Sequence, residues 1–185
     1  MIKVSISQNI KDEYKQKTSN FSNPDSFYHG YIFEWCCKEY LEKKGHEIKG
    51  PFCNIMSQEV KNYLSARNTK ILMSHDLLAF PYGIPIHCKV RNDVKDMDLS
   101  TFKYTFFDSD YLIDNDSVGG LFCVGAYCID YCIIHTIIPT SEMKNFLDEE
   151  ETKRIKKPVY YFGEGKIDIE MLNVVKQNSL ITEEV

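Results

Sequence analysis

The clearest hydrophobic pattern in this 185-residue chain lies between residues 27 and 44. Apolar residues recur there at three- and four-residue spacing, which predicts a helix with one apolar face. The sequence Lys43-Lys44-Gly45 ends this helix, because cations are favoured in a last helical turn and glycine just beyond it. Asp25 or Ser26 is the expected N-cap. The apolar positions are Phe27, Tyr28, Tyr31, Ile32, Trp35, Cys36, Tyr40 and Leu41.

Two further stretches, 70–80 and 84–91, predict a pair of β-strands joined by a turn at Pro81-Tyr82-Gly83. A turn centred on residues 82 and 83 would place Asp76 across from Cys88 or Lys89. Because side chains alternate along a strand, residues 84, 86, 88 and 90 form an apolar face. His87, Lys89 and Arg91 then form a polar row, with Asp76 close to it.

The rest of the chain alternates between helical and strand patterns. We expect strands at 46–49, 102–107 and 159–162, and one long apolar strand over 121–138, buried on both sides. Helices are expected at 57–67, from Thr140 or Ser141 to about 157, and at 167–177. Residues 1–26 are polar and predict an N-terminal strand or arm followed by a loop. The fold class is therefore α/β, with a single domain over 27–185 and a mixed central β-sheet flanked by helices.

Composition narrows the partners that this domain can have. The formal net charge is −5, so any contact with nucleic acid must come from a local basic patch. The densest basic run is Lys153-Arg154-Ile155-Lys156-Lys157, which suits either a phosphate backbone or a solvated helix end. No apolar run approaches the roughly 20 residues that span a bilayer, and the N-terminus does not resemble a secretory signal. We expect no membrane partner and a cytoplasmic location.

The seven cysteines suggest a reduced protein with buried thiols. The series Cys123, Cys128, Cys132 and His135 invites a zinc site, but strand alternation puts Cys123 on the opposite side from the other two cysteines. Core thiols are therefore the preferred interpretation. A thiol hydrolase using Cys36 or Cys37 with His135 is a weaker alternative, because these cysteines lie well inside the helix and not at its N-terminus.

The polar row of the predicted hairpin points to phosphodiester chemistry. Cleavage of a phosphodiester needs a cation that neutralises the phosphate and activates water, and Mg²⁺ prefers carboxylate oxygens as ligands. Asp76 supplies one carboxylate, and Glu34 on the predicted helix can supply another. Lys89 can stabilise the charge that develops in the transition state.

These residues resemble the motif of the PD-(D/E)XK nuclease superfamily, the restriction-endonuclease-like fold, and especially its resolvase-like members. The opening helix has Gly-x-x-x-Glu in Gly30–Glu34, a strand brings Asp76, and the next strand brings His87-Cys88-Lys89 where the family has Glu-x-Lys. The resemblance covers about residues 28–91. It implies a metal-dependent endonuclease, with DNA favoured over RNA, that uses Mg²⁺ or Mn²⁺ and in many cases dimerises. It also implies that Asp76 is the main metal ligand, assisted by Glu34 and His87, and that Lys89 is the catalytic cation.

One residue departs from the family pattern in a way that matters. His87 stands where the second carboxylate is expected, and imidazole suits Mn²⁺ or other transition ions better than Mg²⁺. Three outcomes follow: His87 is a ligand, a carboxylate from Glu34, Glu39 or Asp93 replaces it, or the site is inactive. In the last case the fold would serve as a nucleic-acid-binding or protein-interaction module.

Overall fold

The computed structural model describes residues 1–21, 23–51, 76–81, 83–92, 102–105 and 120–173. Its centre is a six-stranded mixed sheet in the order β1-β7-β6-β4-β3-β2. β4 and β6 are parallel, and the other neighbouring pairs are antiparallel. This confirms the expected mixed α/β architecture with helices against a central sheet. The strands are β1 Ile2–Ser5, β2 Glu47–Lys49, β3 Leu77–Phe80, β4 Ile84–Arg91, β6 Leu121–Cys128 and β7 Tyr131–Pro139.

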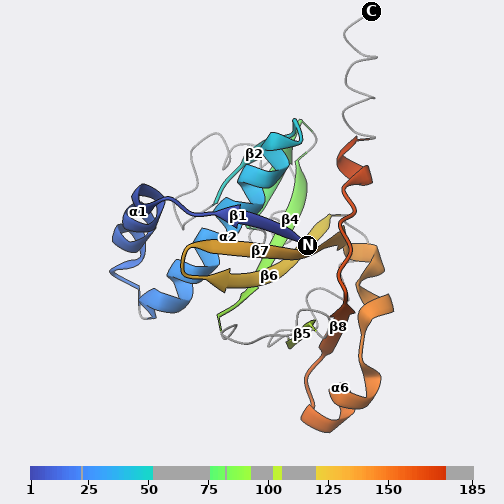
Figure 1. Ribbon diagram of the computed structural model, residues 1–185. Coiled ribbons are helices and arrows are strands. Elements are labelled where there is room, and N and C mark those ends of the chain that lie inside the picture. Colours follow the sequence, from blue (N-terminus) through green and yellow to red (C-terminus); the bar gives the residue numbers. More distant parts are fainter. Residues whose placement is uncertain (22, 52–75, 82, 93–101, 106–119, 174–185) are drawn as a thin grey trace, which may run out of the picture.

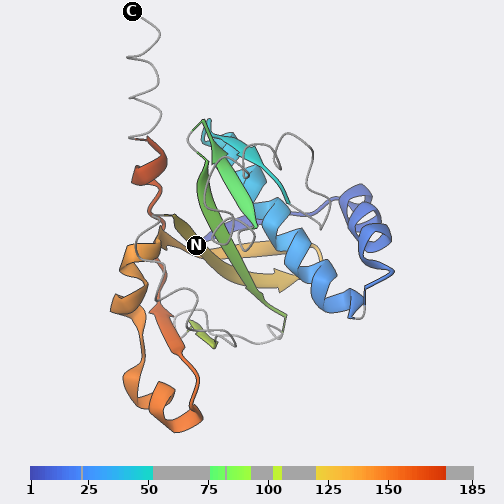
Figure 2. The ribbon, with the colours of Figure 1, turned by 180° about the vertical axis from the view of Figure 1, so that it is seen from behind.

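Helix α2 (Pro24–Lys43) lies across one face of this sheet, as Figure 2 shows. It begins three residues before the expected start, and its N-cap is Asn23, whose side chain accepts a hydrogen bond from the Ser26 N–H. The prediction of Asp25 or Ser26 as the cap is therefore wrong. Proline suits a first helical turn because its missing N–H would have no helical partner there. The largest group of buried apolar side chains fills the space between α2 and the sheet.

Gly125 on β6 allows α2 to approach the sheet closely. A Cβ atom at this position would lie 2.6 Å from Cε2 of Phe33 and 2.0 Å from the carbonyl oxygen of Ile133. Phe33 is completely buried. A side chain at residue 125 would therefore force α2 and the strands apart.

Helix α1 (Gln8–Thr18) is the main feature missed within residues 1–26, which were expected to continue from a strand or arm into a loop. The expected strand is β1, but the loop is largely this helix. Only Tyr14 and Thr18 of α1 are buried, so its apolar stripe is too sparse to show in the sequence. α1 packs beside α2, where the rings of Tyr14 and Tyr31 lie 6.4 Å apart between centroids.

The apolar region 121–138 forms two strands and not one. β6 and β7 are an antiparallel hairpin that turns at Ile129 and Asp130. Their side chains enter the buried clusters on both faces of the sheet, which agrees with the expectation of burial on both sides. The polar residue at 130 marks the turn within an otherwise apolar segment.

A second, two-stranded sheet covers the face of the main sheet opposite α2. It pairs β5 (Phe102–Thr105) with β8 (Val159–Gly163), and with α6 (Glu149–Ile155) it extends below the main sheet in Figure 1. The helix expected up to residue 157 is interrupted: a 3₁₀ helix, η2 (Thr140–Phe146), precedes the short α6. Phe102, Phe122, Tyr160 and Phe162 belong to the buried cluster between the two sheets.

Some expected elements lie outside the described residues, namely the helix at 57–67 and the first part of the strand at 70–80. Of the last expected helix, residues 167–173 are described. Residues 170–173 are helical, but 167–169 are not and Ile167 forms a β-bridge with Ile137, so the expected start at 167 is wrong. Within the described ranges, no helix is both long enough and apolar enough to cross a bilayer.

Candidate functional site

Asp76 lies directly before the first residue of β3 and is hydrogen-bonded to β4. Its N–H donates to the carbonyl oxygen of Ile86 (3.1 Å), and its carboxylate Oδ2 accepts from the N–H of Cys88 (2.7 Å). The two hydrogen bonds fix the Asp76 carboxylate at the open end of the hairpin.

The hairpin register differs from the expected one. Leu77 pairs with Ile86 and Ala79 with Ile84, so a continued ladder would bring Asp76 opposite His87, not Cys88 or Lys89. The difference arises because four residues, 80–83, separate the last paired positions, whereas a two-residue turn was assumed. The predicted apolar face is confirmed, since Ile84, Ile86, Cys88 and Val90 all join the cluster beneath α2.

Glu34 extends the site from the helix side. It is one of the few charged residues buried among the described residues, with 7% of its surface exposed. Burial raises the pKa of the Glu34 carboxyl well above its ordinary value, the negative charge of Asp76 raises this pKa further, and the positive charge of Lys89 opposes both effects. The structure therefore brings Glu34, Asp76 and Lys89 within electrostatic range, from α2, the start of β3 and β4.

Gly30 leaves space one helical turn before Glu34. Side chains on a helix lean toward its N-terminus, so the Glu34 side chain leans toward the turn that contains Gly30. A Cβ atom added at Gly30 would meet no atom of the described residues within 4 Å. The glycine is therefore not needed for packing against those residues, although it costs helix stability.

His87 and Lys89 are half-buried neighbours along one side of β4. The two residues that hold Asp76, Ile86 and Cys88, flank His87 directly. Because side chains alternate along β4, His87 and Lys89 lie on the face of the sheet opposite to Ile86 and Cys88, which pack beneath α2. Of the alternative carboxylates, Glu39 faces Lys43 at 3.8 Å, and Asp93 lies outside the described residues.

A group of thiols lies next to this site. Cys37, Cys88 and Cys123 are buried, and their sulfur atoms all lie within 4.8 Å of one another. Burial raises the pKa values of Cys37 and Cys88, whereas hydrogen bonds from Cys37 and Cys88 lower the pKa of Cys123 to about 5. The sequence offered no signal for this group because its members come from three separate segments.

The two cysteine interpretations weighed from the sequence gain no support. Cys123 lies apart from Cys132, whose thiol instead bonds that of Cys36, and His135 is buried, stacked on Phe102 and hydrogen-bonded to Thr136. Cys36 and Cys37 have no exposed surface, which does not suit a hydrolase nucleophile. The six described cysteines are all free thiols.

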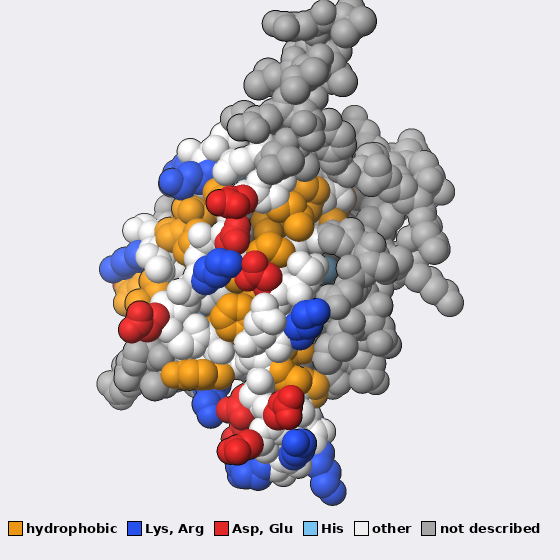
Figure 3. Space-filling view, turned by 90° about the vertical axis from the view of Figure 1, so that its right-hand side faces the viewer, with side chains coloured by type: hydrophobic (Ala, Val, Ile, Leu, Met, Phe, Trp, Pro, Cys, Tyr) orange, Lys and Arg blue, Asp and Glu red, His pale blue; other side chains and the backbone are white. Residues whose placement is uncertain are grey.

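The basic run near α6 is partly neutralised by nearby acids. Lys153 pairs with Glu149, and Arg154 makes two hydrogen bonds to Glu151. Acidic and basic side chains are interspersed on the face shown in Figure 3, including the projecting part at its lower end. This face therefore offers mixed charge and not a continuous basic track.

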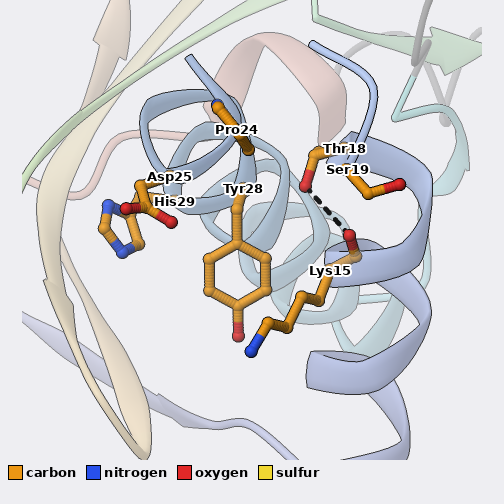
Figure 4. Close-up of a pocket in the computed structure, with 7 residues that line it drawn as sticks. All are labelled: Lys15, Thr18, Ser19, Pro24, Asp25, Tyr28 and His29. Carbon is orange, nitrogen blue, oxygen red and sulfur yellow. Dashed lines mark hydrogen bonds between the residues drawn. The ribbon is translucent and has the colours of Figure 1, made fainter. Parts of the chain in front are cut away.

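A cavity of about 280 Å³ lies between α1 and α2, away from Asp76 and Lys89. In Figure 4 the Tyr28 hydroxyl and the Lys15 ammonium point toward each other on one side, and Asp25 lies beside His29 on the other. Burial lowers the pKa of His29, and the charge of Asp25 opposes this. The sequence gave no indication of this cavity, since one wall belongs to the unpredicted helix α1. The remaining lining residues are Thr18, Ser19 and Pro24.

No family model matches the chain, and neither a curated protein nor a solved structure is significantly similar to it.

Proposed function

We propose that this protein is a metal-dependent phosphodiesterase that cleaves nucleic acid internally, with DNA favoured over RNA as substrate. The observation that supports this most is the buried Glu34 carboxyl, whose pKa is raised further by the Asp76 charge and lowered by the Lys89 charge. The negative charge of Asp76 makes ionisation of the buried Glu34 more costly, and a bound cation would offset this cost. A lysine alone offsets only part of this cost.

The order of elements supports the same proposal. A helix bearing Gly30 and Glu34 precedes the strand that follows Asp76, and an antiparallel strand then brings Lys89. This is the order that the resemblance to the PD-(D/E)XK nucleases implies. A restriction-endonuclease-like core is therefore part of the proposal.

The residues present suit Mg²⁺ or Mn²⁺. Asp76, whose Oδ2 accepts from the Cys88 N–H, would supply one carboxylate, and Glu34 would add a second. Mg²⁺ in proteins is commonly held by one or two carboxylates together with water and substrate phosphate oxygens. The His87 imidazole would favour Mn²⁺. When bound, the cation neutralises the phosphate and lowers the pKa of a bound water.

Cys88, Glu34 and Lys89 would each have a different role in the proposed reaction. The Cys88 N–H orients the Asp76 carboxylate, so no ordering cost arises when substrate binds. Glu34 would hold a cation only as the ionised carboxylate, so its raised pKa would make cation binding stronger at higher pH. Lys89, whose positive charge lowers the pKa of Glu34, would stabilise negative charge that develops on the phosphate.

A plasmid-nicking assay tests this proposal. Supercoiled DNA is incubated with the wild-type protein and Mg²⁺ or Mn²⁺, with and without a chelator. Lys89→Met and Asp76→Asn are expected to abolish cleavage. Lys43→Met is the matched control, because the Lys43 side chain is 74% exposed at the far end of α2. Equal nicking by the wild-type, Lys89→Met and Asp76→Asn proteins would contradict the assignment.

The second candidate is a nuclease-like module that binds but does not cleave. His87 in place of a carboxylate favours it, because the described residues of the site then contain two carboxylates, Glu34 and Asp76. This candidate predicts metal-independent binding to DNA or to a protein partner, with no nicking under any metal. Cleavage of both strands of a duplex would need two sites, so the nuclease proposal includes a homodimer, which sedimentation can test.

A further inference from the structure

The three thiols next to the proposed catalytic site have the geometry of a metal site of a different kind. Cys37 lies on the sheet-facing side of α2, and Cys88 and Cys123 are paired residues on the parallel strands β4 and β6. Their sulfur atoms lie within 4.8 Å of one another. Helix and strands thus present three sulfurs to a single point.

The spacing of the sulfurs suits one coordinated ion. A metal–sulfur bond of about 2.3 Å places three sulfurs roughly 4.0 Å apart around a central cation. The observed upper limit of 4.8 Å therefore requires only sub-ångström shifts of side chains. A hard cation such as Mg²⁺ takes oxygen ligands, whereas thiolates select soft cations such as Zn²⁺ and Cu⁺.

The burial of these three thiols excludes a role as nucleophile toward a substrate. Cys37 and Cys123 have no exposed surface, and Cys88 has 7%, so the group is not placed to attack a substrate. Among the described residues, no histidine, aspartate or glutamate joins the group at comparable distance. Cys36 and Cys132, which are equally buried, lie outside it.

We propose that Cys37, Cys88 and Cys123 form a three-thiolate site for one soft d¹⁰ cation, Zn²⁺ or Cu⁺. Each protonated thiol releases its proton to solvent as its metal–sulfur bond forms, and no electron transfer is involved. Each candidate ion has one advantage at this site. With three thiolates, Zn²⁺ leaves a smaller net negative charge buried than Cu⁺ does. Cu⁺ can be held by three ligands, whereas Zn²⁺ usually takes four.

This cation would also support the neighbouring site. The backbone N–H of Cys88 holds the Asp76 carboxylate, and its sulfur belongs to the thiol group. A metal–sulfur bond at Cys88 would fix β4 at the residue that orients Asp76. The inference does not depend on the proposed nuclease function, since soft-ion binding and phosphodiester cleavage are measured separately.

The test measures Zn²⁺ and Cu⁺ binding by reduced, full-length protein refolded without oxygen, in competition with a chromophoric chelator. One equivalent of either ion is expected to bind to the wild type, and Mg²⁺ is not expected to displace it. Cys37→Ala and Cys123→Ala should weaken binding by more than about 100-fold, since even loss of an outer-shell partner costs 10–100-fold. Cys36→Ala is the matched control, because it removes an adjacent, equally buried thiol.

A second measurement does not depend on the variants folding. Co²⁺ added to the wild-type protein should give the intense near-ultraviolet absorption of cobalt–thiolate bonds, and Zn²⁺ should abolish it. The same absorption is expected from Asp76→Asn, which leaves all three thiols in place. Absence of this absorption together with no Zn²⁺ or Cu⁺ binding would overturn the proposal. Binding that is unchanged in Cys37→Ala and Cys123→Ala would also overturn it.

Discussion

Replacing Asp76 separates its structural role from its chemical one. The carboxylate accepts a 2.7 Å hydrogen bond from the Cys88 N–H, which lies in a residue only 7% exposed. Asp76→Ala leaves that N–H without its acceptor, and an unsatisfied buried donor costs about 1–3 kcal/mol. Loss of the Asp76 charge offsets part of this destabilisation, because that negative charge disfavours ionisation of the buried Glu34 and raises its pKa. We therefore expect a net destabilisation of about 1–2 kcal/mol.

Asp76→Asn provides the matched comparison. Its side-chain oxygen can still accept from Cys88 while the charge is lost, so we expect a cost below about 1 kcal/mol. Urea unfolding followed by circular dichroism measures both variants, and unchanged m-values would show that the same surface is exposed on unfolding. For a chain of this size, about 1–2 kcal/mol corresponds to a fall in Tm of roughly 2–8 °C. An alanine variant as stable as the asparagine variant would refute the assigned role of this hydrogen bond.

Three further predictions concern the rest of the site. Because the pKa of folded Glu34 is raised, its stabilising contribution is complete below the ordinary value of 4.5 and is lost as pH rises through the folded value. The free energy of unfolding of the wild type should therefore fall as pH rises, by about 1.4 kcal/mol for each unit by which the pKa of Glu34 is raised. Glu34→Gln should make this fall smaller, and an unchanged pH profile would contradict the burial argument. Gly30→Ala should stabilise the protein by about 0.5–1 kcal/mol in urea unfolding, since the new methyl group meets open space; a loss of stability would mean that this space is filled. Lys89→Met should raise the pKa of Glu34 further, because the positive charge of Lys89 lowers it. Infrared titration of the buried carboxyl measures this pKa, and an unchanged value would show that Lys89 does not act on Glu34.

The parts of the fold that sequence patterns predicted are those with dense apolar periodicity. The stripe along α2 and the alternation along β4 both follow directly from residue type. The sequence did not predict helix α1, because only Tyr14 and Thr18 of this helix are buried and its apolar pattern is sparse. The sequence of region 121–138 predicts one strand because both strands of the hairpin are apolar, and a single Asp130 is weak evidence for a turn.

The candidate site was predictable in its members but not in its geometry. Chain order pointed to Glu34, Asp76 and Lys89, whereas the burial of Glu34 depends on how α2 lies on the sheet. The difference of one or two residues in register depends on the length of the β3–β4 connection. The group of Cys37, Cys88 and Cys123 was beyond sequence reasoning, because ligand spacing within one segment says nothing about residues that meet only in the folded chain.

Binding of Mn²⁺ measured by isothermal titration calorimetry tests the central claim most directly, namely that Glu34 and Asp76 form one cation site beside Lys89. Reduced protein with its thiol group saturated by Zn²⁺ removes competition from the cysteines. The account predicts one bound Mn²⁺ per chain, weaker binding at low pH, and loss of binding in both Asp76→Asn and Glu34→Gln. Glu42→Gln should bind as the wild type does, because Glu42 lies on the same helix but pairs with Lys38 at the surface. Mn²⁺ binding that persists unchanged in Asp76→Asn and Glu34→Gln would contradict the account.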